Sequence, residues 1–273
     1  MSLLRIKLRS ALAHLRQLRG QDEQSVSGAD SPAAIALLDR LLVKAPAGAP
    51  SPVAAVLPGE AARLTISDRD QLLAAVLEAT FGPRVESTAR CSACGAPFDL
   101  DFRVDEISEA VRRPAGTSGA SPAPGGAFEL PNGRRFRLPT GEDEIAVLDL
   151  PEEHAKAELL RRCVLEGAAD PTSDLLAAME AEGGVIDLDV GARCPECGHE
   201  DAVRFAVQAY LLQALLQERD ELRREVHRLA TAYGWSHRVI LSLPRSERRT
   251  LVRLVETEAS RPRSTHAEGR WTS

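Results

Sequence analysis

Aromatic residues are scarce in this 273-residue chain: phenylalanine, tryptophan and tyrosine together make up 4% of it. Its cores must therefore consist largely of leucine, valine and alanine, a composition that favours helices. No apolar run is long enough to cross a bilayer. The formal net charge of −6 gives the whole chain no attraction to nucleic acid or to an anionic membrane, so any basic surface has to be local.

The N-terminus lacks the features of a secretory signal. Residues 1–19 place basic side chains among the leucines, with no uninterrupted apolar run before a cleavage site. We interpret this stretch as a short amphipathic helix whose apolar side carries Leu4, Leu12, Leu15 and Leu18. Such a helix packs on its own domain; docking to a partner or lying on a membrane surface is the alternative. The expected location of the protein is the cytoplasm.

The chain is long enough for one large domain or two ordinary ones. Its 44% hydrophobic and 27% charged residues are typical of a globular protein. The predicted organisation is N-terminal amphipathic helices with a Pro/Ala-rich linker over residues 1–62, a zinc-ribbon α+β domain over 63–205 with an insertion at 113–190, a C-terminal helical module over 206–260, and a disordered tail over 261–273.

Local signals place most secondary structure. A helix capped by Ser67 ends at Gly82-Pro83. Asn132-Gly133 is the turn of a β-hairpin. Loops or flexible linkers are predicted over 45–58 and 113–127. The other predicted elements are helices over 34–43, 152–165, 174–182 and 206–232, a short helix capped by Ser236, a last helix starting at Pro244, and strands over 84–89, 98–104 and 185–190. Residues 203–207 are predicted to be a strand or the entry of a helix.

Cysteines are few and grouped. Four of the five form two Ala-Arg-Cys-x-x-Cys-Gly motifs, at Cys91 and Cys94 and at Cys194 and Cys197. Two cysteines three residues apart can point the same way around a tight turn, and the following glycine opens the backbone there. The pattern indicates thiolates that bind a metal in a reducing compartment rather than disulfides.

Tetrahedral zinc takes four ligands, and the two motifs supply four. Closing a loop of about 100 residues between them costs roughly 4 kcal/mol in chain entropy. A structural zinc site can contribute about 10–16 kcal/mol. The sequence therefore predicts one structural Zn²⁺ shared by Cys91, Cys94, Cys194 and Cys197, within an interrupted zinc ribbon of the α+β class.

The cysteines and their neighbours also allow other roles. The cysteines could instead be merely buried in two turns, whereas a thioredoxin-like redox role is disfavoured because neither pair opens a helix after a strand. A catalytic zinc needs an open ligand position, which four thiolates exclude, so His199 and Glu200 are expected to be solvated. Cys163 is interpreted as a small buried hydrophobe. No nucleophile motif, P-loop or dinucleotide fingerprint is present, so we predict no enzymatic activity and no catalytic residues.

The last helix is rich in arginine, with Arg245, Arg248, Arg249 and Arg253. Glutamates dilute this basic face, so contact with DNA is disfavoured. We expect instead a solvated face or a surface for an acidic protein partner. Trp235, which joins two helices, is interpreted as the anchor of the helix corner rather than as a stacking platform.

Several motifs together resemble one protein family. They are a helix start at residues 67–73 leading into 90–95, a hairpin over 130–135 running into 138–141, the second cysteine motif at 193–198, and an ending made of Tyr233-Gly234-Trp235-Ser236, Ile240-Leu241-Ser242-Leu243-Pro244 and Arg248-Arg249. This arrangement, over roughly residues 65–256, resembles the baseplate hub assembly chaperones of T-even-type contractile-tailed phages and their relatives in phage-like injection systems. The ending is the most distinctive element.

The resemblance implies an assembly factor or minor component of a contractile-tail baseplate. Its partners would be hub or wedge proteins, and the protein could be incorporated in the phage-tail-like particle. Members of that family differ in whether they carry the cysteines, which leaves open whether the family function requires zinc. The alternative prediction is a zinc-ribbon protein that binds nucleic acid or takes part in transcription, and a metal-dependent enzyme is the second alternative.

Overall fold

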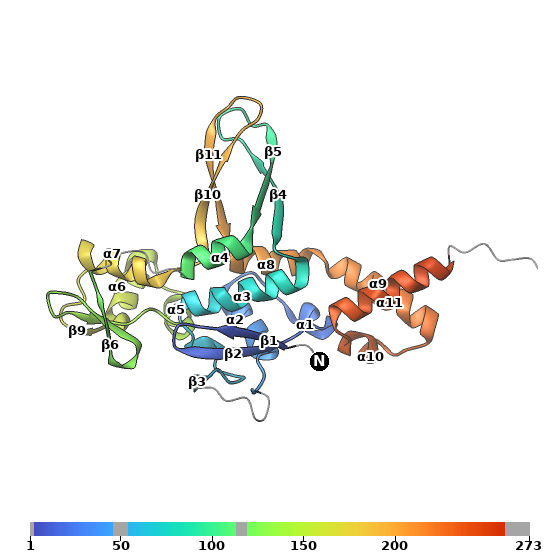
Figure 1. Ribbon diagram of the computed structural model, residues 1–273, viewed down its shortest axis with the longest axis horizontal. Coiled ribbons are helices and arrows are strands. Elements are labelled where there is room, and N and C mark those ends of the chain that lie inside the picture. Colours follow the sequence, from blue (N-terminus) through green and yellow to red (C-terminus); the bar gives the residue numbers. More distant parts are fainter. Residues whose placement is uncertain (1–2, 46–53, 113–118, 260–273) are drawn as a thin grey trace, which may run out of the picture.

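The computed structural model describes residues 3–45, 54–112 and 119–259. The fold mixes helices and strands, in line with the predicted class. Figure 1 shows an elongated molecule with a central body, a lobe at one end, a helical module at the other, and an arm of two hairpins rising from the body. The predicted tail over 261–273 lies outside the described residues.

The central body packs helices against an N-terminal β-hairpin. Strands β1 and β2 are antiparallel, and β3 adds parallel to β2. Buried apolar residues from Ile6 to Leu215 form one core, so segments far apart in the chain, from the N-terminal hairpin to α8, contribute to the body. The elements are β1 (Leu3–Lys7), β2 (Ala11–Arg16), α1 (Gly20–Ser25), α2 (Ser31–Leu41), β3 (Ala54–Ala55), the 3₁₀ turn η1 (Ala61–Arg63), α3 (Ile66–Phe81), α4 (Val104–Arg112) and α8 (Val207–Gln217).

The predicted amphipathic helix over residues 1–19 is wrong, because this stretch forms the β1–β2 hairpin. Leu4, Ile6 and Leu8 alternate with basic residues, and this period of two suits a strand with one face on the core. Ile6 and Leu8 are buried there. In β2 the four residues 12–15 are all buried, so burial on both faces hides the alternation that would mark a strand.

Helix α3 runs through the middle of the body. Its N-cap is Thr65 rather than the predicted Ser67, and the Thr65 hydroxyl accepts the backbone N–H of Asp68 at 3.1 Å. Gly82 ends the helix at φ 94°, in the left-handed region that favours glycine. The first turns of α3 are buried although they are charged, and Asp70 accepts the backbone N–H of Ile186 at 2.9 Å.

The lobe is a four-stranded sheet, in the order β6-β7-β8-β9, covered by helices. The predicted hairpin at Asn132-Gly133 is confirmed by the antiparallel pairing of β7 with β8. The predicted linker over 113–127 is wrong for its described part, which includes a strand paired with β7. The elements are β6 (Ser121–Ala123), η2 (Pro124–Gly126), β7 (Ala127–Glu129), β8 (Arg135–Phe136), α5 (Gly141–Val147), α6 (Glu152–Cys163), β9 (Val164–Glu166) and α7 (Ser173–Gly183).

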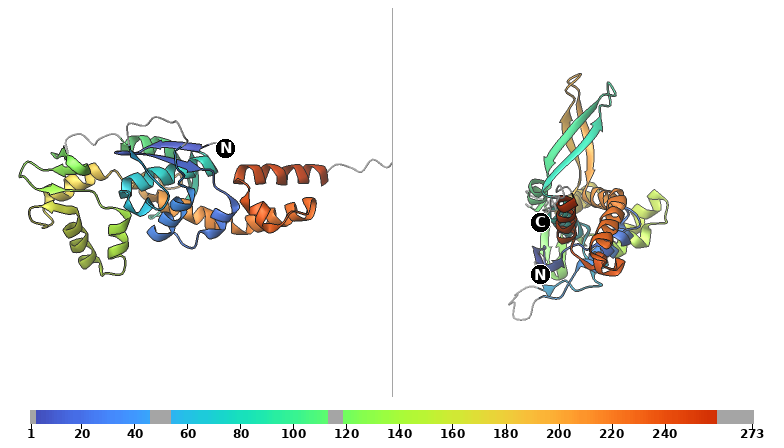
Figure 2. Two further views of the ribbon diagram at one scale, coloured as in Figure 1. Left: turned by 90° about the horizontal axis from the view of Figure 1, so that it is seen from below. Right: turned by 90° about the vertical axis from the view of Figure 1, so that its right-hand side faces the viewer.

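The helical module consists of α9 (Arg219–Tyr233), α10 (His237–Ser242) and α11 (Arg245–Ala259). The predicted continuous helix over 206–232 is in fact two helices, because Glu218 at φ −82°, ψ 4° separates α8 from α9. The core of the module is small, with Leu229, Ile240 and Val252 as its buried residues. In the view from below in Figure 2, α9 and α11 lie side by side and point away from the body.

The arginines of α11 hold this module on the body. Arg245 and Arg248 are buried, contrary to the predicted solvated or partner-binding face. Both pair with Glu23 of α1, and Arg248 also pairs with Glu225 of α9. A buried charge needs an opposite charge close by, and Glu23 and Glu225 provide it.

Candidate metal centre

The arm carries both cysteine motifs at its tip. One hairpin consists of β4 (Arg84–Arg90) and β5 (Pro97–Arg103), and the other of β10 (Asp187–Arg193) and β11 (Glu200–Ala206). Each pair is antiparallel over seven residues, and no strand of one hairpin pairs with a described strand of the other. Figure 2 shows in its right-hand view that the two hairpins wind around each other above the body.

The two hairpins are copies of one unit. Each residue of the first hairpin corresponds to the residue 103 positions later in the second, so Cys91 corresponds to Cys194 and Cys94 to Cys197. The strand bounds follow the same shift. So does the junction to the next helix, where the N–H of Val104 donates to Pro83 and the N–H of Val207 donates to Ile186, both at 2.9 Å. The repeat that is visible in sequence as the two cysteine motifs thus extends over both hairpins and the starts of α4 and α8.

Each motif forms the same tight turn. The N–H of Gly95 donates to the carbonyl of Cys91, and the N–H of Gly198 to that of Cys194, both at 2.9 Å. The two glycines have φ 73° and 74°, values that residues with a β-carbon rarely adopt. The glycine after the second cysteine is therefore required by the backbone, as the sequence predicts.

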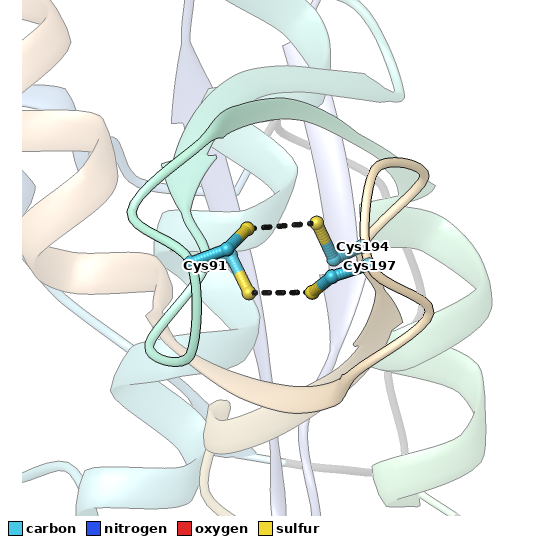
Figure 3. Close-up of side chains that lie close together, drawn as sticks. Cys91, Cys194 and Cys197 are labelled. Atoms are coloured by element: carbon cyan, nitrogen blue, oxygen red, sulfur yellow. Dashed lines mark hydrogen bonds between the residues drawn. The ribbon is translucent and has the colours of Figure 1, made fainter.

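The four sulfur atoms converge between the two turns (Figure 3). Cys91 Sγ lies 3.6 Å from Cys197 Sγ, and Cys94 Sγ lies 3.8 Å from Cys194 Sγ. All four lie within 4.8 Å of one another. The repeat makes these two contacts equivalent to each other, because Cys91 corresponds to Cys194 and Cys94 to Cys197. The cluster therefore has approximate two-fold symmetry. The arrangement is compatible with a metal ion held by one ligand atom from each cysteine.

The sulfurs of the cluster differ in how tightly they hold a proton. The backbone N–H of Cys94, against the effect of burial, lowers the pKa of Cys91 to about 6. Backbone hydrogen bonds at Ala96 and His199 act on Cys94 and Cys197 in the same direction, but the neighbouring sulfurs and burial raise the pKa of both thiols, that of Cys197 to about 12. Cys91 and Cys194 are buried, whereas Cys94 and Cys197 are exposed. Besides the two cysteines, Phe98 is the one fully buried residue of the described core at the tip, so little apolar packing holds the tip together.

One direct contact joins the two turns in addition to the sulfurs. The Asp201 carboxylate of β11 accepts the backbone N–H of Ser92 at 2.8 Å. Lower on the arm, the rings of Phe102 and Phe205, which correspond under the 103-residue shift, meet edge to face at 4.8 Å. Sequence reasoning missed both contacts, since Asp201, Phe102 and Phe205 belong to neither cysteine motif.

The remaining candidates lie apart from the cluster or face solvent. Cys163 ends α6 in the lobe and is fully buried, and burial raises the pKa of its thiol to about 11, which agrees with the predicted role as a buried hydrophobe. His199 and Glu200 follow the second motif and are exposed, as expected.

Comparison with protein-family models, with curated proteins and with solved structures finds no match to this chain. Within the described ranges, no helix has the length and apolar content that crossing a membrane requires.

Proposed function

We propose that this protein is a non-enzymatic assembly factor or minor component of a contractile-tail baseplate, and that it acts by binding other proteins on a zinc-stabilised scaffold. The observation that carries the scaffold role is the cysteine cluster at the tip of a projecting arm, where it joins two hairpins that share no backbone hydrogen bonds between described strands. The contractile-tail context rests on the motif resemblance, above all on the ending from Tyr233 to Arg249.

The proposed metal is Zn²⁺ in a structural role. With a Zn–S bond of about 2.3 Å, tetrahedral geometry separates two sulfurs by ~3.8 Å. The two short sulfur contacts, at 3.6 and 3.8 Å, agree with that separation. Four thiolates complete the shell and leave no ligand position for substrate or water. Zinc bound there cross-links the two hairpins and takes part in no reaction.

Exposed apolar groups support a protein-binding role. Tyr233 and Trp235 stack at 4.9 Å and are each 38% exposed, so this corner turns an aromatic pair toward solvent instead of anchoring it in the module. Val239 nearby in sequence is also exposed. Tyrosine and tryptophan are enriched in protein interfaces because they combine large apolar area with a polar edge.

The nucleic-acid alternative loses its main support. It depended on the arginines of α11, of which Arg245 and Arg248 are buried against glutamates and Arg249 pairs with Glu218 and Glu225. Arginines neutralised in this way cannot also neutralise phosphates.

The decisive experiment is co-expression of the protein with each hub and wedge protein of a contractile tail whose genes neighbour its own. We expect a stable complex with at least one of them on size-exclusion chromatography, and loss of assembled baseplates when the gene is deleted. Normal baseplates after deletion, together with no complex with any of these proteins, would refute the proposal.

The zinc part has its own test. X-ray absorption of the purified protein should show one zinc ion with four sulfur neighbours at about 2.3 Å. A shell that contains oxygen or nitrogen would contradict a closed structural site and favour the metal-dependent enzyme instead.

A further inference from the structure

The four sulfurs at the tip of the arm form two close pairs. Cys91 Sγ lies 3.6 Å from Cys197 Sγ, and Cys94 Sγ lies 3.8 Å from Cys194 Sγ. Each pair takes one cysteine from each hairpin, so both contacts run across the arm, as the dashed lines in Figure 3 show. The bond of a disulfide is about 2.05 Å long, so either contact has to close by less than about 2 Å to become one.

Each pair combines an exposed cysteine with a buried one. Cys94 and Cys197 are exposed, whereas Cys91 and Cys194 are 3% and 1% exposed. A small oxidant in solution therefore reaches Cys94 and Cys197 first. In both cases the sulfur close enough to complete a disulfide belongs to the buried cysteine of the other hairpin.

The two hairpins also touch through groups that bind no metal. The Asp201 carboxylate accepts the backbone N–H of Ser92, the residue after Cys91, at 2.8 Å. Lower on the arm, the rings of Phe102 and Phe205 meet edge to face. These contacts remain when a metal ion leaves, so they keep the paired sulfurs within reach of each other.

We propose that the cluster is also a site of oxidation by hydrogen peroxide, at which two disulfide bonds between the hairpins replace the zinc ion. The bonds follow the two short contacts and join Cys91 to Cys197 and Cys94 to Cys194. This inference rests on the zinc-stabilised scaffold of the proposed function and adds its regulation. The arm is cross-linked in both states, by the metal under reducing conditions and by disulfides after oxidation.

The oxidation of each pair transfers two electrons to one peroxide molecule. The exposed thiolate attacks a peroxide oxygen, the O–O bond breaks and hydroxide leaves, which gives a sulfenic acid. The buried thiolate then attacks that sulfur, the S–O bond breaks, and a second hydroxide leaves as the disulfide forms. Two protons from solvent convert both hydroxides to water. Zinc is released as Zn²⁺, because the thiolates that bound it are consumed.

The first test is peptide mapping of the zinc-loaded full chain after treatment with hydrogen peroxide. A chromogenic chelator should record the release of one zinc ion per chain. After denaturation without reductant and alkylation of free thiols, trypsin leaves one motif in residues 91–103 and the other in residues 194–204. We expect these two peptides to be joined to each other, with the pairing above, while the fully buried Cys163 is recovered as an alkylated thiol.

The inference is overturned if the two peptides are recovered separately, each with a disulfide inside its own motif. Zinc release that leaves sulfinic acids instead of disulfides would overturn it as well, and so would zinc that stays bound.

Two double variants test which sulfurs react, and each keeps one cysteine per hairpin. Cys94→Ser with Cys194→Ser keeps one complete short contact, whereas Cys94→Ser with Cys197→Ser keeps one buried sulfur from each contact. We expect peroxide to join the two tryptic peptides at least about tenfold faster in the first variant than in the second. Equal rates in the two would contradict the pairing. The mapping on the unmodified chain keeps the inference testable if either variant fails to fold.

Hydrogen exchange tests whether disulfides take over the structural role of the metal. The oxidised, zinc-free arm should exchange its backbone amides about as slowly as the zinc-loaded arm. A zinc-free arm that is kept reduced, with a chelator and a phosphine present, should exchange faster. Exchange in the oxidised arm that is as fast as in the reduced, zinc-free arm would overturn the replacement of one cross-link by the other.

The outcomes separate this inference from the proposed function. A protein that binds zinc through four sulfurs and enters a baseplate complex, but yields unjoined peptides after peroxide, refutes the oxidation inference alone. Joined peptides from a protein that forms no complex with any hub or wedge protein refute the baseplate function alone.

Discussion

Asp70 provides the sharpest stability prediction, because it is a buried carboxylate that connects α3 to the base of the arm. Its side chain is 4% exposed and accepts the N–H of Ile186, the residue that precedes β10. Burial raises the pKa of Asp70 from 3.8 to about 6, although Arg69 and the Ile186 hydrogen bond act in the opposite direction. Glu144 and Asp187 raise it further.

The sign of the pH effect follows from proton binding. The folded protein binds the Asp70 proton more tightly than the unfolded chain does, so this group contributes most to stability below about pH 3.8. That contribution is lost as the pH rises through about 6. A shift of this size, at 1.36 kcal/mol per pH unit, corresponds to about 3 kcal/mol between the two limits.

The substitution Asp70→Asn removes this titration while keeping an oxygen that can accept the Ile186 N–H. Urea unfolding of the variant and the unmodified protein should therefore be measured from pH 4 to pH 7.5. The free energy of unfolding of the variant minus that of the unmodified protein should rise by up to about 3 kcal/mol across this range. Metal release at low pH affects both proteins and so largely cancels in the difference.

Asp99→Asn serves as the control, because Asp99 is an exposed carboxylate on the outer side of the arm. Because its side chain is exposed, Asp99→Asn measures the effect of an aspartate-to-asparagine change without the burial that distinguishes Asp70. The reasoning fails if the Asp70→Asn difference is flat, or falls, between pH 4 and pH 7.5.

Two further predictions concern the cysteine cluster and the buried arginines. Cys194→Ser should reduce bound zinc, measured by elemental analysis, from one per chain to near zero. It should also speed hydrogen exchange in the arm while the body stays protected. The control is Cys163→Ser, which changes a buried cysteine outside the cluster and should leave the bound zinc at one per chain. Equal metal loss in both variants would contradict the assignment. Arg248→Ala should lower the free energy of unfolding by up to about 3–5 kcal/mol, since it removes the most deeply buried cation of the cluster and leaves Glu23 and Glu225 with one pairing arginine each. Arg253→Ala on the exposed side of α11 should change it by less than about 0.5 kcal/mol, and similar losses in the two arginine variants would count against the ion-pair cluster.

Predictions from sequence were reliable where a short segment carries its own structural reason. Asn132-Gly133 predicted a hairpin because a tight turn needs residues that tolerate positive φ. The Cys-x-x-Cys-Gly motifs predicted two turns for the same reason, and the chemistry of four thiolates predicted that they meet. They meet although 99 residues separate Cys94 from Cys194, because each hairpin emerges from the same body.

Predictions failed where burial depends on distant neighbours. The leucines of residues 1–19 suit a helix or a strand, and pairing of β1 with β2 decides between them. The arginines of α11 have the composition of a solvated face, and Glu23 of α1, far away in sequence, is part of what buries Arg245 and Arg248. Likewise, Glu218 gives no sequence signal of the break between α8 and α9.

The sequence by itself therefore determined the local turns, most helices and the ligand chemistry of the cysteine cluster, because these depend on backbone geometry and on atoms a few residues apart. The tertiary structure alone decided the strand character of the N-terminus and the burial of the α11 arginines. Each of these depends on which surfaces meet in space, and the free energy of burying a charge or leaving an apolar side chain in water is set by neighbours that chain order does not reveal.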